Sequence, residues 1–159
     1  MSAIKNYKAY WYNCDNINDN GWGCGWRCLQ MLLSQNNKYK DIFTIGREVK
    51  KYIYNDLQIN DKLPFTDIKW IGEYMKRYGN IYKIITINSI NNINEIVLKL
   101  EKYFTDYNKL VVVVSSGAVS LIGGIKKLEG KTYVYLIDPH VWYKTDKFPS
   151  LNGFGNGGK

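Results

Sequence analysis

The chain changes its hydrophobic spacing part-way along, from the period of α-helices to runs typical of β-strands, and this change limits the folds it can adopt. In the first part, apolar residues recur at intervals of three and four, which predicts helices. These helices are expected over residues 25–35, 44–54, 67–78 and 92–105. In the last part, apolar runs predict strands over residues 109–115, 118–126 and 132–138. Helices followed by contiguous strands indicate an α+β domain in which a largely antiparallel sheet packs against N-terminal helices.

Local signals place several ends of these elements. Thr66 is the expected N-cap of the third helix, and Gly79 is its stop signal. The sequence Leu-Glu-Gly-Lys at 128–131 predicts a hairpin turn between the last two strands. Aromatic and isoleucine-rich runs at 7–13 and 80–87 predict two further strands.

The length of 159 residues fits one domain, because a second hydrophobic core would leave both cores too small. Hydrophobic residues make up 45% of the chain, which is enough for a packed core. We therefore expect residues 1–151 to form a single domain and the Gly- and Asn-rich residues 152–159 to be a flexible tail.

Apolar runs, cysteines and charge indicate a compartment and exclude some partners. No run approaches the roughly 20 apolar residues that span a bilayer, and the first residues lack the apolar core of a secretory signal. Three irregularly spaced cysteines suit free thiols in a reducing compartment. The net charge of +8 is spread over short Lys/Arg pairs without a nucleic-acid-binding motif. We expect a cytoplasmic protein that binds neither membranes nor nucleic acid.

His140 is the one histidine of the chain, so a mechanism that needs an imidazole must use it. Asp138 precedes it by two residues at the end of the last predicted strand, where residues two apart share a face about 6.6 Å apart. Pro139 stiffens the link between them. A carboxylate that holds one ring nitrogen leaves the other free to take a proton, which is the orienting role in a catalytic triad. The alternative is an ordinary histidine at a strand end, with Asp138 as a turn residue.

Cys24 stands where the first helix is expected to begin, and this position suits a nucleophile. The positive end of the helix dipole and a nearby imidazolium both lower the pKa of a thiol. A cysteine at a helix start, followed by a sheet that carries a histidine, is the order of papain-like folds. The alternative for Cys24 is a small buried residue in a glycine-rich turn.

Three short blocks carry a resemblance to a known family. They are Asp-Asn-Gly-Trp-Gly-Cys-Gly-Trp-Arg at 19–27, Trp-Ile-Gly at 70–72 and Leu-Ile-Asp-Pro-His at 136–140. In this order they resemble the signature blocks of proteases specific for the ubiquitin-fold modifier (UfSP). The resemblance implies a papain-like thiol protease that cleaves after the C-terminal glycine of a ubiquitin-like modifier, either to mature a precursor or to release the modifier from target lysines. No cofactor is implied, because thiol chemistry uses side chains and backbone donors.

The resemblance also assigns roles to residues around Cys24. Tyr12 matches a family tyrosine that helps form the oxyanion hole, which the backbone N–H of Cys24 would complete. Core packing in a Tyr-rich segment is the alternative for Tyr12. Trp22, Gly23 and Trp26 are the expected substrate-binding residues, the two indoles forming a narrow slot that passes glycine, although tryptophans beside a helix start are as often plain core.

Departures from the family pattern keep alternatives open. A related branch that acts on polyubiquitin takes its base from the segment that corresponds to 115–120, which has no histidine here, so the Asp-Pro-His arrangement is favoured. The block around Cys24 partly resembles that branch, so a deubiquitinase remains an alternative. The length leaves no room for the N-terminal recognition domain of longer members, and little chain follows the Asp-Pro-His, so the chain resembles the minimal short form. The expected partners are a ubiquitin-like modifier and its conjugates, and we expect a monomer.

Other interpretations come from different classes of protein. A zinc site would have to gather Cys14, Cys24, Cys28 and His140, but the chain has no close Cys-x-x-Cys pair and we expect no metal. Cys14 and Cys28 are expected to be packing residues. A decayed protease that only binds a ubiquitin-like protein is a further alternative, against which the intact candidate residues argue. An autophagy-type cysteine protease also pairs a cysteine with Asp-Pro-His, but the block at 70–72 favours UfSP.

Overall fold

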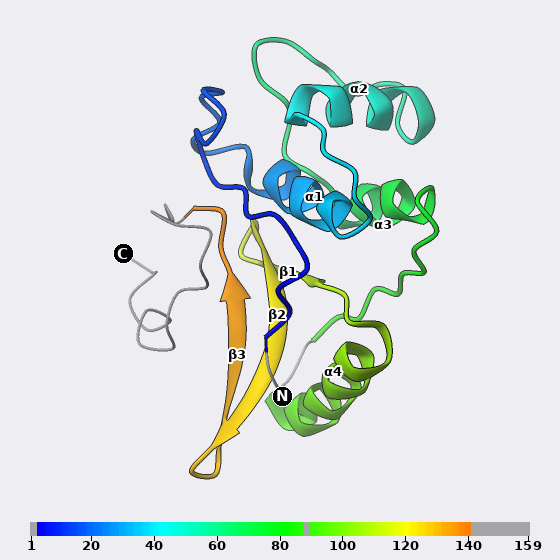
Figure 1. The fold of residues 1–159 in the computed structure, drawn as a ribbon. Helices are drawn as coiled ribbons and strands as arrows, with labels where there is room; N and C mark the ends of the chain where they lie inside the picture. Colours follow the sequence, from blue (N-terminus) through cyan, green and yellow to red (C-terminus); the bar gives the residue numbers. More distant parts are fainter. Residues whose placement is uncertain (1–2, 88–89, 141–159) are drawn as a thin grey trace.

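The computed structural model describes residues 3–87 and 90–140, in which helices come first and strands last. The elements in chain order are α1 (Cys24–Ser34), α2 (Ile42–Tyr52), α3 (Ile68–Lys76), the short 3-10 helix η1 (Ile90–Asn92), α4 (Ile93–Tyr107), β1 (Val111–Ser115), β2 (Ala118–Leu128) and β3 (Lys131–Ile137). Helices α1 to α3 gather at one end of the molecule, and the β2–β3 hairpin and α4 extend toward the other (Figure 1). The predicted α+β architecture with an antiparallel sheet is confirmed.

The sheet has the strand order β1-β2-β3, and both pairs are antiparallel. Each connection is a two-residue turn, Ser116–Gly117 or Glu129–Gly130, with both residues at positive φ. Such turns have the backbone twist that matches the flanking strands of a hairpin. The hairpin turn predicted at 128–131 is therefore confirmed.

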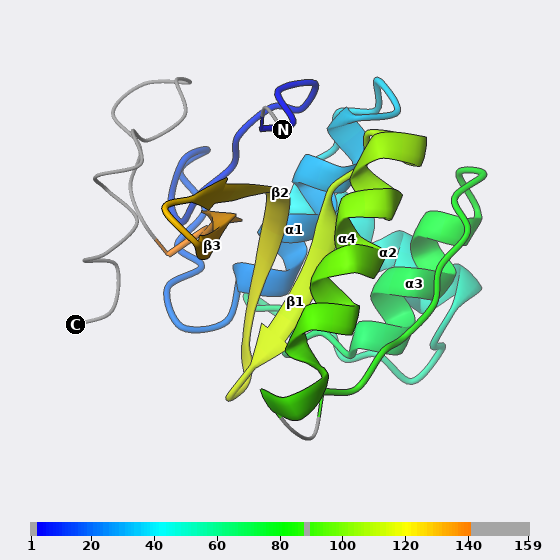
Figure 2. The ribbon, with the colours of Figure 1, turned by 90° about the horizontal axis from the view of Figure 1, so that it is seen from below.

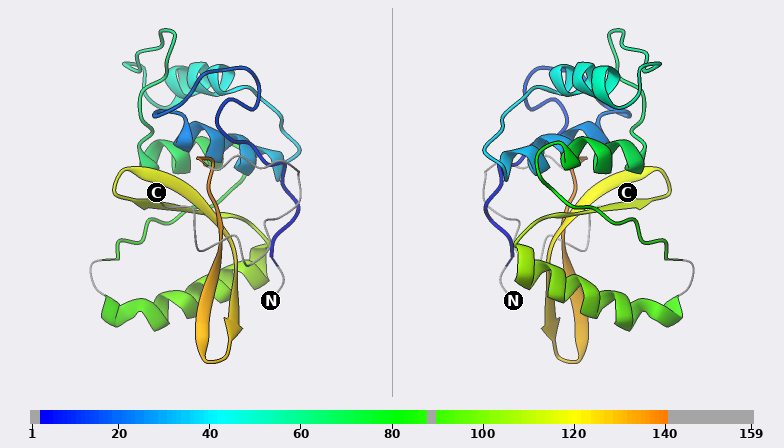
Figure 3. Two further views of the ribbon diagram at one scale, coloured as in Figure 1. Left: turned by 90° about the vertical axis from the view of Figure 1, so that its left-hand side faces the viewer. Right: turned by 90° about the vertical axis from the view of Figure 1, so that its right-hand side faces the viewer.

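β2 bends where its pairing with β3 shifts, between Ile122 and Ile125. Gly124 has φ +152°, a conformation that residues with a side chain rarely adopt. The first half of β2 pairs with β1 beneath the helices, and the second half runs with β3 as a hairpin that points away from them (Figure 3). Seen from below, α4 lies alongside β1 and β2 (Figure 2).

Helix α1 is the centre of the core. All of its residues are buried, and it packs against β2, α2 and α3. Its N-cap, Gly23, provides no side-chain hydrogen bond, so tertiary packing rather than capping holds this helix. The residue that opens α1, Cys24, therefore belongs to a helix that is buried along its whole length.

The start of α3 differs from the prediction. The N-cap is Asp67 rather than Thr66, and its carboxylate accepts the N–H of Lys69 at 2.8 Å. Both residue types can cap, but the negative charge of aspartate also suits the positive end of the helix dipole. Gly79, with φ +81°, follows the last turn as predicted.

The strand predicted at 7–13 is wrong. The backbone turns here, since the N–H of Cys14 donates to the carbonyl of Trp11 at 3.2 Å and Asn13 has φ +61°. A residue in the left-handed region cannot continue an extended strand. The turn directs Tyr12 toward the end of β3, where its N–H donates to the carbonyl of Pro139.

The strand predicted at 80–87 is also wrong. This segment pairs with no strand among the described residues, and Ile81 is 87% exposed. The ring of Tyr82 packs against α3 instead, so close to Gly72 that a Cβ there would lie 2.5 Å from it. β-branched residues favour a strand when cross-strand neighbours are present to pack against, and here they have none in the described chain.

Two expectations concern the C-terminal tail and membrane-spanning segments. The tail predicted at 152–159 lies outside them. No helix within 3–87 and 90–140 has both the length and the apolar character that crossing a membrane requires.

Candidate active site

Three segments that are far apart in the chain meet at the start of α1. The turn around Tyr12 is joined to the residues after β3 by its hydrogen bond to Pro139, 3.0 Å long. The ring of Tyr12 meets the ring of His140 edge-on, with centroids 4.9 Å apart and an interplanar angle of 74°. Both side chains lie close enough to Cys24 to lower the pKa of its thiol. With Asp138 beside His140, the four predicted catalytic residues lie together.

Cys24 is 5% exposed at the first position of α1. Burial raises the pKa of its thiol, but hydrogen bonding to His140, to the backbone of Val119 and to Tyr12, with the charge of His140, lowers the pKa below its ordinary value overall. The positive end of the α1 dipole acts in the same direction. A lowered pKa increases the fraction of thiolate, which is the nucleophilic form.

Asp138 and His140 lie just past the strand, because β3 ends at Ile137. The expectation that they share a strand face is thus corrected. A tight turn brings them together instead: Oδ1 of Asp138 accepts the backbone N–H of His140 at 2.9 Å and also contacts the ring nitrogen Nδ1. Aspartate commonly closes such a turn by bonding the backbone two residues on. Since Nδ1 faces the carboxylate, Nε2 is the ring nitrogen left for the thiol of Cys24.

Asp138 and His140 each favour the charged form of the other. The pKa of His140 is raised to about 10, first by its hydrogen bond to Asp138 and next by that to Cys24, while burial acts against it. Burial would raise the pKa of Asp138, but hydrogen bonds from the ring and backbone of His140 lower it. These shifts favour an imidazolium at His140 beside the carboxylate of Asp138, and they increase the thiolate fraction of Cys24.

Tyr12 places a phenol beside Cys24. Burial raises the pKa of Tyr12, and the charge and hydrogen bonding of the Cys24 thiol raise it further, whereas the backbone N–H of Cys24 lowers it. The phenolic oxygen therefore lies near both the sulfur and the backbone N–H of Cys24. A neutral phenol in this position is a hydrogen-bond donor next to the reacting atom.

The predicted substrate-binding residues are placed differently from one another. Trp26 has no exposed surface and its Nε1–H donates to the carbonyl of Pro64 at 2.8 Å, so it is a core residue, and its expected role as a wall of a slot is corrected. Trp22 is 7% exposed and packs edge-on against Phe43. Gly23 has no room for a side chain, because a Cβ would lie 1.9 Å from Oδ2 of Asp19. Packing alone accounts for the glycine at this position.

A buried charge network next to the site was not foreseen from the sequence. Arg27 has no exposed surface, and its guanidinium donates to Asp15, to Asp19, to Oε1 of Gln30 and to the sulfur of Cys14. Burial lowers the pKa of Arg27, but hydrogen bonds to Asp15 and Asp19 raise it above its ordinary value. The signal that could have indicated the network is an arginine on a helix with otherwise apolar neighbours, preceded by two aspartates.

The other two cysteines are packing residues in the described structure. Cys28 has no exposed surface and its sulfur lies 3.7 Å from the carbonyl oxygen of Val119, and burial raises the pKa of its thiol well above the ordinary value. Cys14 is half-buried beside the guanidinium of Arg27. Within residues 3–87 and 90–140, no three His, Cys, Asp or Glu side chains gather in an arrangement that could hold a metal ion.

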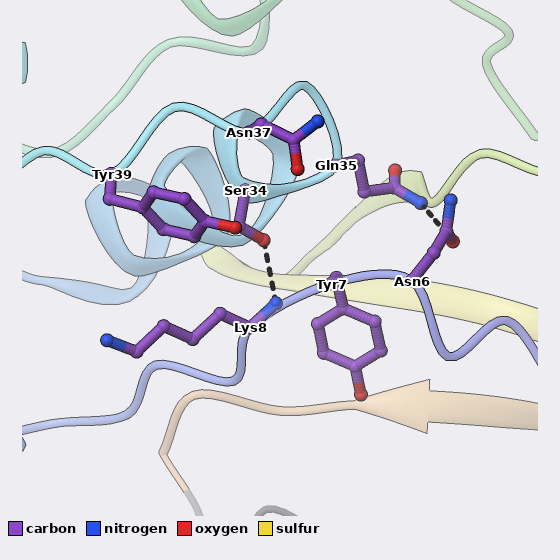
Figure 4. Close-up of a pocket in the computed structure, with 7 residues that line it drawn as sticks. All are labelled: Asn6, Tyr7, Lys8, Ser34, Gln35, Asn37 and Tyr39. Atoms are coloured by element: carbon purple, nitrogen blue, oxygen red, sulfur yellow. Dashed lines mark hydrogen bonds between the residues drawn. The ribbon is translucent and has the colours of Figure 1, made fainter.

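An open hollow of about 750 Å³ lies at the other end of α1 (Figure 4). Its lining residues are Asn6, Tyr7, Lys8, Ser34, Gln35, Asn37 and Tyr39. Ser34 is ten residues along the helix from Cys24, about 15 Å away at the rise of an α-helix. The hollow is separate from the candidate site.

Comparisons with known proteins show the family of the chain. The model of the family described as Peptidase family C78 matches residues 2–156. A "Probable Ufm1-specific protease" of Oryza sativa subsp. japonica is 29% identical over 92% of this chain and 24% of its own length. A "Probable Ufm1-specific protease 1" of Drosophila melanogaster is 28% identical over 84% of this chain and 62% of its own length. The chain thus spans less than two thirds of either relative.

A solved structure shares the fold. The crystal structure of UfSP from C. elegans superposes with a TM-score of 0.69 and 21% sequence identity, over 87% of this chain and 27% of that chain. The papain-like α+β fold expected from the sequence is confirmed by this likeness.

Proposed function

The chain belongs to peptidase family C78, and on this premise we propose that it is a cysteine protease that cleaves after the C-terminal glycine of the ubiquitin-like modifier Ufm1. The observation that carries the proposal is the meeting of Cys24, His140, Asp138 and Tyr12 at the start of one buried helix. The names of the rice and Drosophila relatives support the choice of modifier.

In the first step, the thiolate of Cys24 attacks the carbonyl carbon of the modifier's last glycine. The negative charge that develops on the carbonyl oxygen is stabilised by the hydroxyl of Tyr12 and the backbone N–H of Cys24, which lie close together beside the sulfur. When the tetrahedral intermediate collapses, Nε2–H of His140 protonates the departing amine. The products are that amine and a thioester between Cys24 and the modifier.

In the second step, a water molecule replaces the amine. His140, now neutral, takes a proton from this water as the oxygen attacks the thioester carbonyl. Asp138 holds Nδ1 and so keeps Nε2 directed at the reacting atoms in both steps. Collapse of the second intermediate returns the thiolate and imidazolium and releases the modifier with a free carboxylate.

The proposal extends to the partner and the boundaries of the active unit. The substrate is a ubiquitin-like protein, as a precursor with residues beyond its glycine or as a conjugate on a lysine, and residues 1–151 act as one catalytic domain. Trp22 and the backbone at Gly23 are proposed to contact the substrate's glycine, because they directly precede Cys24. The protein is proposed to act as a monomer in the cytoplasm, without a cofactor, since the reaction needs no other group.

Electrophilic probes test this function directly. Wild type and Cys24→Ser are incubated with Ufm1 and with ubiquitin, each carrying an electrophile in place of its C-terminal carboxylate, and adducts are measured by intact mass. Cys24→Ser retains Cys14 and Cys28, so this variant is its own control for labelling at another thiol. The expected result is one adduct on wild type with the Ufm1 probe and none on Cys24→Ser.

Other outcomes have definite meanings. Labelling by the ubiquitin probe alone would replace the proposed modifier with ubiquitin and keep the reaction type. Labelling of Cys24→Ser would remove Cys24 as the nucleophile. Absence of any adduct, with reversible binding of Ufm1 retained, would make the protein a binding module. Incubation with a Ufm1 precursor and with a Ufm1–lysine conjugate then separates maturation from deconjugation.

A further inference from the structure

Arg27 is a fully buried cation that takes no part in the proposed reaction steps. Its Nε and Nη2 donate to Asp19, and its Nη1 and Nη2 donate to Asp15. A buried ion pair is often no more stabilising than apolar residues of similar volume. The network therefore calls for a role beyond stability, and its contacts indicate which one.

On one side, Asp19 holds the segment that carries Tyr12. Oδ1 of Asp19 accepts the backbone N–H of Asn13 at 2.8 Å and Nη2–H of Arg27 at 3.0 Å. Asn13 follows Tyr12 directly and has φ +61°, so the chain reverses at this point. The turn is thus held at Tyr12 by the carbonyl of Pro139 and at Asn13 by the carboxylate of Asp19.

On the other side, Asp19 holds the start of α1. Its backbone carbonyl accepts the N–H of Gly23 at 2.9 Å, and the carbonyl of Gly23 accepts the N–H of Arg27 at 2.9 Å in the first turn of the helix. The carboxylate of Asp19 packs directly against Gly23, where a Cβ would collide with Oδ2. Asp19 and Arg27 thus link the turn of Tyr12 to the helix of Cys24 through their side chains.

We infer that Asp19 and Arg27 are positioning residues that hold the hydroxyl of Tyr12 where the oxyanion forms. The inference rests on the proposed function, since it names what supports one donor of that oxyanion hole. A hydroxyl on a loop stabilises a transition state only when it is held in place, and a misplacement of about 1 Å can cost about 10²-fold in rate. Asp19 fixes the position of the Tyr12 turn relative to the start of α1, because it hydrogen-bonds to both at once.

Asp19→Asn is the most direct variant. Oδ1 and Oδ2 of Asp19 both accept from donors, so an amide must place its NH₂ against at least one N–H of Arg27 or Asn13. We expect kcat on a Ufm1-derived substrate to fall about 10-fold, and KM to change less than about twofold, because a misplaced oxyanion donor acts on the transition state. Arg27→Lys, which keeps the charge and loses the fork, is the second variant if Asp19→Asn does not fold.

A double-mutant cycle with Tyr12→Phe tests whether the effect passes through Tyr12. Loss of one oxyanion donor is expected to lower kcat about 10²-fold. If Asp19 acts by holding that donor, Asp19→Asn adds less than about threefold once the hydroxyl is gone. Losses that multiply to about 10³-fold would overturn the inference.

Alkylation of Cys24 by iodoacetamide gives a readout that a general structural defect would change. This displacement at a saturated carbon forms no oxyanion, so Asp19→Asn should alkylate within about threefold of the wild-type rate. An equal loss of alkylation and of kcat would mean that the network acts on the thiol or on folding, and the inference would fail.

Glu48→Gln is the matched control. Glu48 forms a part-buried ion pair with Lys40 at 2.6 Å between α2 and the loop before it, and the side-chain partners of Glu48, which are Lys40, Tyr74 and Tyr78, are not residues of the candidate site. This variant is expected to lower the thermal unfolding temperature and to leave kcat unchanged. If wild type turns over Ufm1 substrates and Asp19→Asn and Arg27→Lys have the same kcat, the inference is overturned and the proposed function stands. Wild type that does not turn over Ufm1 substrates would overturn the proposed function and the inference together.

Discussion

Cys24 and His140 face each other in the candidate site but are held by different kinds of interaction. Cys24 opens a helix that is buried along its whole length, and Arg27, one turn further on, is paired within the core. His140 has a side chain that is 37% exposed and lies in a turn beyond the end of β3, where Asp138 holds both its backbone and its ring. The position of the proposed nucleophile depends on tertiary packing, and that of the proposed base depends on a contact with a residue two positions away.

This difference predicts which changes affect chemistry and which affect stability. On the base side, a substitution removes a local contact while the rest of the core stays as it is, so activity should fall without unfolding. On the nucleophile side, the same residues that surround Cys24 also form the core. Substitutions there should lower the free energy of unfolding as well as the rate.

The largest effect is expected from His140→Asn. It removes the general base and the cation that lowers the pKa of Cys24, so turnover of Ufm1 substrates should fall by about 10⁴-fold or more. The pKa of the thiol should rise, and alkylation at neutral pH should slow because less thiolate is present. Rates of iodoacetamide alkylation against pH check this. If the acidic limb of the alkylation rate against pH stays at its wild-type position, the assignment of His140 as the cation beside Cys24 is contradicted.

Asp138→Asn sharpens the comparison, because it leaves the imidazole in place. An amide can donate to Nδ1 and so favours the wrong tautomer, and kcat should fall about 10³- to 10⁴-fold. The pKa of His140 is raised to about 10, first by Asp138, so its loss should lower that pKa. The imidazolium is then lost at a lower pH, and the alkaline limb of the rate profile moves in the acidic direction. Asp106→Asn, at an exposed ion pair with Lys102, is the control and should change neither rate nor limb.

Arg27→Met tests the nucleophile side by its stability. Asp19 would be left as an uncompensated buried carboxylate, so the free energy of unfolding should fall by about 3–5 kcal/mol. Urea denaturation measures this, with Lys102→Met as the comparison. That side chain is 77% exposed in its ion pair, where solvent screens the attraction, so its loss should change the free energy of unfolding far less. Equal losses for the two variants would mean that the buried network is no more important to the fold than a surface pair.

The smallest effects separate two glycines that lie two residues apart. Gly23→Ala must displace the carboxylate of Asp19 and should cost about 1–3 kcal/mol. Gly21 has φ +83° and no atom within 4 Å of a Cβ built there, so Gly21→Ala should cost only about 1 kcal/mol of backbone strain. Urea denaturation should show the larger loss of stability for Gly23→Ala and the smaller loss for Gly21→Ala. The reverse order would contradict the close contact between Gly23 and Asp19.

Much of the fold could be predicted from local patterns. The helix at Cys24, the final hairpin and the sheet of three strands all follow from spacing and turn residues within a few positions of each other. The strands predicted at 7–13 and 80–87 failed for the opposite reason, because a strand needs a partner from elsewhere in the chain. One segment turns at Asn13, and the other packs Tyr82 against α3.

In the candidate site too, local features could be predicted and long-range contacts could not. The sequence by itself was enough to select Cys24, Asp138 and His140 as candidate catalytic residues, because a helix start and an Asp-Pro-His are short-range features. Only the tertiary structure decided that Trp26 is core and that Arg27 is paired with Asp19 inside the molecule. Burial and pairing are set by contacts between residues distant in the chain, and a one-dimensional pattern holds no record of which distant residue fills the remaining space.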